Sequence, residues 1–84
     1  MIANTVRHSK FVPGLKLEIR KGNDATYLCF SKMNKDKRHV EMWAINNEGP
    51  RLIKADNGGM FGDIVYHIKN TVNAYAEKLK SNRP

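Results

Sequence analysis

Aromatic and basic side chains recur together in the strand-like part of this sequence, and together they could bind a nucleic acid. Tyr27 and Trp43 each lie in a segment predicted to be a strand. Such a segment places alternate side chains on one face of a sheet. Rings on an uncovered face can stack on unpaired nucleobases, at about 1–3 kcal/mol per base, while Lys and Arg neutralise phosphates. The spacing predicts a site of this kind for single-stranded DNA or RNA, formed by Lys16, Arg20, Tyr27, Lys32, Lys35, Lys37, Arg38, Trp43 and Arg51.

The charge of the chain favours a polyanionic partner. The formal net charge is +7 on 84 residues. Residues 1–40 hold nine Lys and Arg against three acids, whereas residues 41–84 hold six against five. A positive field gathered on one part of a small protein favours nucleic acid as the partner. The ordinary alternative is a set of solvated charges that keeps the protein soluble.

Residues that could catalyse a reaction or bind a metal are scattered. His8, His39 and His67 have no Cys or carboxylate at metal-ligand spacing, and Cys29 is the only cysteine. A single cysteine excludes an internal disulfide and a Cys-rich zinc site, and it fits a reducing compartment. We therefore expect no metal, no cofactor and no enzymatic activity.

The distribution of apolar residues argues against a membrane protein. No segment approaches the roughly 20 apolar residues of a membrane span. Arg7, His8 and Lys10 interrupt any apolar run near the N-terminus, which argues against a signal peptide. We expect a cytoplasmic protein that makes no membrane contact.

The elements that would position the basic and aromatic residues follow from the spacing of apolar positions. From Phe61 the apolar period becomes 3.6, which predicts an amphipathic helix of about five turns. The segment Asp56-Asn57-Gly58-Gly59 before it is typical of a turn, with an anion site at the helix start as the less favoured interpretation. Earlier, a period of two predicts strands separated by turn residues. The prediction is a single domain over residues 1–84: a basic N-terminal arm (1–14), a sheet (15–55, with strands at 15–21, 26–33, 39–45 and 51–55) and a helix (60–80).

These elements predict an α+β fold, a four-stranded antiparallel meander with one long C-terminal amphipathic helix packed on one sheet face. The helix must bury its apolar stripe, and one face of the sheet is the surface available to it. The other face stays open and carries Glu41 and Trp43. Because a shift of one residue exchanges the faces of a strand, this placement depends on register. The expected helix-facing residues are Leu15, Leu17, Ile19, Leu28, Phe30, Val40, Met42 and either Leu52 or Ile53.

An uncovered sheet face with a Trp and a Tyr also fits a protein interface. The alternative function is therefore a protein-interaction module, such as a small phage-type regulator or inhibitor that binds a larger enzyme. A homodimer formed through the same face would hide both aromatic rings. The sequence alone does not decide between these partners.

Overall fold

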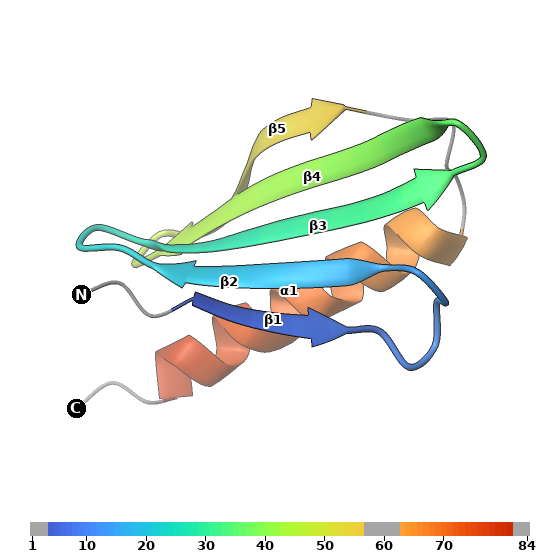
Figure 1. The fold of residues 1–84 in the computed structure, drawn as a ribbon. Coiled ribbons are helices and arrows are strands. Elements are labelled where there is room, and N and C mark those ends of the chain that lie inside the picture. The colour runs from blue at the N-terminus through green and yellow to red at the C-terminus, as the bar shows by residue number, and fades with distance from the viewer. Residues whose placement is uncertain (1–3, 57–62, 82–84) are drawn as a thin grey trace.

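The computed structural model describes residues 4–56 and 63–81 of the chain. The strands form one sheet in the order β1-β2-β3-β4-β5, and every neighbouring pair is antiparallel. The predicted α+β fold with an antiparallel sheet and a C-terminal helix is confirmed. The Gly-rich turn expected before the helix falls largely outside the described residues, as does the expected helix start. The elements, shown in Figure 1, are β1 (Asn4–His8), β2 (Lys16–Lys21), β3 (Thr26–Asn34), β4 (Lys37–Asn46), β5 (Gly49–Asp56) and α1 (Asp63–Ser81).

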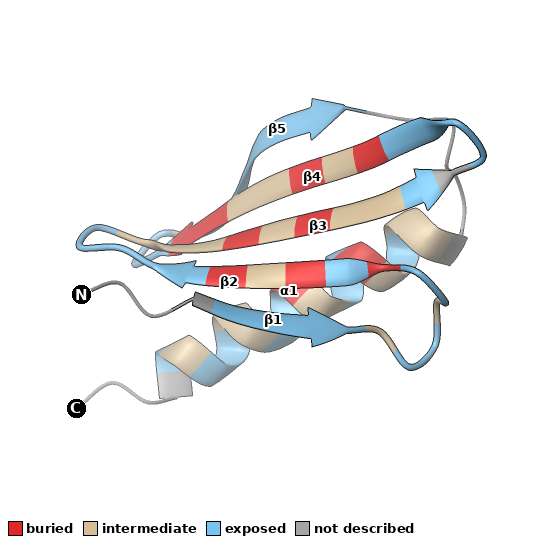
Figure 2. Cartoon of the chain, in the orientation of Figure 1, coloured by how far each residue is buried: buried red, intermediate tan, exposed pale blue. Residues whose placement is uncertain are grey.

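The described sheet has five strands rather than the predicted four, because part of the N-terminal arm forms β1. Val6 is the one strongly apolar residue of β1, so the sequence shows no alternation there. The strand pairs with β2 through the backbone, placing Arg7 opposite Leu17 and His8 opposite Lys16. Residues 5–8 are exposed (Figure 2). Backbone pairing with β2 therefore holds β1 in place more than burial of its side chains does.

The core lies between α1 and one face of the sheet, and no other described element covers the opposite face (Figure 1). Figure 2 shows buried residues on β2, β3, β4 and α1, whereas β1 and β5 are exposed. Burying a large apolar side chain stabilises the fold by about 1.5–3 kcal/mol. The buried apolar cluster consists of Leu15, Leu17, Ile19, Leu28, Phe30, Ile45, Ile68 and Val72.

The register of β4 differs from the prediction by one residue. Trp43 lies opposite Leu28, a core residue of β3, so Trp43 and Glu41 face α1. Val40 and Met42 point to the opposite, uncovered face. The prediction that placed Val40 and Met42 in the core, and Glu41 and Trp43 on the uncovered face, is therefore wrong. Val-Glu-Met-Trp-Ala-Ile is apolar on both faces, so alternation could not choose between them.

The edge strand β5 contributes little to the core. Leu52 and Ile53, one of which was expected there, remain 44% and 47% exposed. A bulge changes the pairing: Trp43 lies opposite Leu52 and Met42 opposite Lys54, so Ile53 is the extra residue. The prediction of a core residue in this strand is wrong.

The hairpin turns use local polar bonds and positive φ angles. Lys35, between β3 and β4, has φ 61°, and Gly49, after the β4–β5 turn, has φ 107°. The Glu48 amide donates to Asn46 Oδ1 at 2.8 Å. These contacts are typical of tight turns, and they bring consecutive strands side by side.

Candidate functional site

The uncovered face of the sheet, here named the open face, has an uncharged strip on β3 and β4 between charged residues on β2 and β5. Directly opposed residues in antiparallel strands share a face, so the pairing sets the open face in rows across the sheet. From β2 to β5, each row has uncharged residues on β3 and β4 and charged residues on β2 and β5. The rows are Arg20, Tyr27, Ala44 and Arg51; then Glu18, Cys29, Met42 and Lys54; then Lys16, Ser31, Val40 and Asp56. The edge strand β1 adds Val6 beside Glu18 and His8 beside Lys16.

The charged residues that β2 and β5 place on the open face are mainly positive, with four cations and two acids in these rows. Arg20 Nη2 lies 2.8 Å from Glu18 Oε1. The Arg20 side chain is 53% exposed, so solvent screens this ion pair and its contribution to stability is about 1 kcal/mol or less. Arg51 and Lys54 line the other edge, on β5. The open face therefore presents an uncharged strip between two strands, β2 and β5, each with a positive surplus.

The structure brings together five of the predicted site residues on the open face. Arg38 joins the face because it lies opposite Met33, two residues beyond Ser31 in β3. Lys35 occupies the exposed turn next to Arg38. The five are Lys16, Arg20, Tyr27, Arg38 and Arg51.

Three predicted site residues lie on the other side of the sheet. Lys32 and Lys37 are in the same alternation as Phe30 and Trp43, on the side where α1 packs. The Lys32 ammonium donates to the Met33 carbonyl at 3.2 Å. The prediction that placed Trp43 on the open face with Tyr27 is therefore wrong, and Lys32 and Lys37 lie on the helix side of the strands that lead to the β3–β4 turn.

Trp43 is held on the helix side by a buried polar cluster. The Trp43 indole packs against the core, and its Nε1–H donates to Glu41 Oε1 at 3.0 Å. Glu41 Oε2 lies 2.8 Å from His39 Nε2. His39 and Glu41 are only 3% and 6% exposed. The cluster explains how an acid can occupy a core-facing position: both carboxylate oxygens have partners.

Sequence reasoning missed Lys54 as part of the positive edge. Strict alternation from Arg51 would place Lys54 on the opposite face. The bulge at Ile53 restores Lys54 to the face of Arg51. A single-residue bulge on an edge strand leaves no clear pattern in the sequence, so this residue could only be assigned from the structure.

Comparisons with protein-family models, curated proteins and solved structures found no match to this chain. Within residues 4–56 and 63–81, no three His, Cys, Asp or Glu side chains converge as a metal site would need. No helix in the same residues combines the length and apolar character that crossing a membrane requires.

Proposed function

We propose that this protein binds single-stranded nucleic acid, without catalysis, on the open face of its sheet. The arrangement that carries the proposal is the uncharged strip of β3 and β4 between four cations on the flanking strands β2 and β5. The strip would contact bases, and Lys16, Arg20, Arg51 and Lys54 would neutralise phosphates. The net charge of +7 supports the same partner through long-range attraction.

Single strands fit this face better than a duplex does. A duplex hides its bases in the stack, whereas an unpaired strand can turn its bases toward an uncharged surface. Tyr27 is the aromatic residue of the strip and lies between Arg20 and Ala44 in its row. It is the residue expected to stack, in place of Trp43.

Lys35 and Arg38 extend the positive surface at the β3–β4 turn. Both side chains are exposed, and Arg38 belongs to the open face. The strand would therefore run along the sheet toward this turn, with its phosphates near both groups of cations.

A protein partner is the second candidate, and the centre of the open face favours it. Cys29, Val40 and Met42 are partly buried by their neighbours and form an apolar patch inside a charged rim. An apolar centre with a polar rim is typical of protein interfaces. A second copy of the chain or a larger enzyme could cover this patch.

The test is fluorescence anisotropy of a labelled 20-nucleotide single strand, measured over a salt series. A single strand loses affinity with a log–log slope of about −0.7 for each phosphate neutralised. Arg51→Gln with Lys54→Gln should weaken binding and make the slope shallower by about 1.4. Tyr27→Ala should cost about 1–3 kcal/mol of binding free energy.

Matched controls lie on the solvent side of α1. Lys69→Gln with Lys80→Gln removes the same charge, and Tyr66→Ala removes an exposed ring. Both controls should bind nearly as tightly as the unchanged protein. Equal losses in the two charge variants would refute a specific role for the open face. Absence of binding at low salt, together with a dimer in sedimentation equilibrium, would favour the protein interface.

A further inference from the structure

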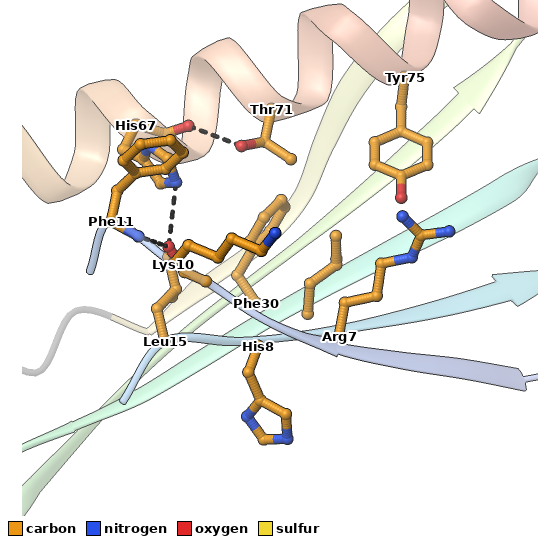
Figure 3. A pocket seen from close by; sticks show the side chains of 11 residues that line it. Arg7, His8, Lys10, Phe11, Leu15, Phe30, His67, Thr71 and Tyr75 are labelled. Carbon is orange, nitrogen blue, oxygen red and sulfur yellow. Dashed lines mark hydrogen bonds between the residues drawn. The ribbon is translucent and has the colours of Figure 1, made fainter. Parts of the chain in front are cut away.

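A groove runs between the edge strand β1 and the helix, on the side opposite the open face. It holds a main cavity of about 310 Å³ and a smaller one of about 170 Å³. Arg7 and Tyr75 line both, so the two cavities meet at this pair. Figure 3 shows the Arg7 and Tyr75 side chains pointing toward one another, while His8 points away from the helix.

The main cavity has an apolar floor. Leu15, Leu17 and Phe30 line it, and all three belong to the buried core. A cavity of about 150 Å³ lined by such residues is large enough for benzene, and ligand pockets start at about 300 Å³. The floor can therefore take an apolar body of ring size or somewhat larger.

The rim of the groove is positive. Arg7 and Lys10 lie at the main cavity, and Lys21 and Lys78 lie at the smaller one. Figure 3 shows the Lys10 side chain extending over the cavity toward Phe30. None of the described residues that line either cavity is acidic. Four cations without a carboxylate select for a negatively charged ligand.

One wall of the main cavity is the β1–β2 connection, which is fixed by Ser9. Ser9 Oγ accepts the amides of Phe11 and Val12 at 3.1 and 3.0 Å, and it lies 3.4 Å from His67 Nε2 on α1. The ring centroids of Phe11 and His67 lie 5.7 Å apart. The wall is therefore preformed, yet Phe11 remains 82% exposed. An aromatic ring left at the rim offers further apolar contact to a ligand.

From these observations we infer that the groove binds a small organic anion with an apolar body. The body lies on Leu15, Leu17 and Phe30, and a carboxylate or phosphate group lies between Arg7 and Lys10. This site is separate from the open face, so it does not depend on the nucleic-acid proposal.

The test is an amide chemical-shift titration with four probes: benzoate, phenyl phosphate, benzyl alcohol and acetate. At least one of the two aromatic anions should bind about tenfold or more tightly than benzyl alcohol, because the neutral probe gains nothing from the cations. Acetate should bind weakest, since it lacks the apolar body. Comparing benzoate with phenyl phosphate then identifies the preferred anionic group. The shifts should map to residues 7–11 and 67–75.

Two kinds of variant test separately the positive charge of the rim and the space inside the cavity. Arg7→Gln with Lys10→Gln should weaken binding by about tenfold or more. Because both side chains are exposed, these changes should not prevent folding. Lys69→Gln with Lys80→Gln removes the same charge elsewhere and should leave affinity unchanged. Thr71→Leu enlarges a side chain that lines the cavity and should also block the aromatic anions.

Three results would overturn the inference. The first is that neither aromatic anion gives saturable shifts at about 10 mM. The second is that benzyl alcohol binds as tightly as the aromatic anions. The third is that the Arg7 and Lys10 double variant binds them with unchanged affinity. Shifts confined to β3, β4 and β5 would assign the anion to the open face instead. Such a map would reject the groove and leave the nucleic-acid proposal standing.

Discussion

At the scale of single residues, Glu41 is a buried acid on the helix side of β4. Its two oxygens contact different partners, the His39 ring at 2.8 Å and the Trp43 indole N–H at 3.0 Å. A buried carboxylate is costly when unpaired, but here both oxygens are satisfied and the large indole is packed against the core. The sequence could not show this, because a Glu between apolar residues is ordinarily read as solvent-facing.

Replacing Glu41 should destabilise the protein more than replacing an exposed acid. We expect Glu41→Ala to lower the free energy of unfolding by about 2–4 kcal/mol, because the His39 ring and the Trp43 N–H lose their shared partner in a buried site. Glu41→Gln keeps one acceptor and should lose about 1 kcal/mol. Urea unfolding measures both, with Glu48→Gln as the exposed control. A loss for Glu41→Gln no larger than that of Glu48→Gln would contradict the role of the cluster.

At the scale of elements, alternation predicted the faces of β2 and β3 correctly. The core residues expected in these two strands are buried, because they occupy every second position and so point to the same face. They are Leu17, Ile19, Leu28 and Phe30. The face of β4 was mispredicted because both of its faces are apolar. The strand β1 was missed because it pairs through its backbone with little apolar content of its own.

The β3–β4 turn carries a conformational cost that a single substitution can relieve. Lys35 has φ 61°, a left-handed conformation that glycine adopts without steric penalty. We expect Lys35→Gly to raise the free energy of unfolding by about 0.5–1 kcal/mol. Lys37→Gly, which lies in β4 with ordinary strand geometry, should lower it by a similar amount. Urea unfolding that showed Lys35→Gly to be the more destabilising of the two would contradict this account of the turn.

At the scale of the whole molecule, the helix covers one side of the sheet and leaves the other side open. The open face carries an uncharged strip between charged residues of β2 and β5, and the helix side carries the core and the groove along β1. Composition gave the net positive charge, and the spacing of apolar residues predicted the fold class, because charge is a sum over the chain and strands and helices have distinct periods. Neither could predict the groove, because Arg7, Lys10 and Tyr75 meet only when β1 joins the sheet.

The measurement that tests the central claim most directly compares two neighbouring side chains on opposite faces of β4. Met42 lies on the open face, and Trp43 lies on the helix side. A short single-stranded oligonucleotide is titrated into protein with a ¹³C-labelled methionine methyl group and ¹⁵N-labelled indole. We expect saturable shifts of the Met42 methyl resonance and almost none of the Trp43 Nε1–H resonance. A Trp43 shift as large as that of Met42, or binding that moves neither, would contradict the assignment of the open face as the nucleic-acid site.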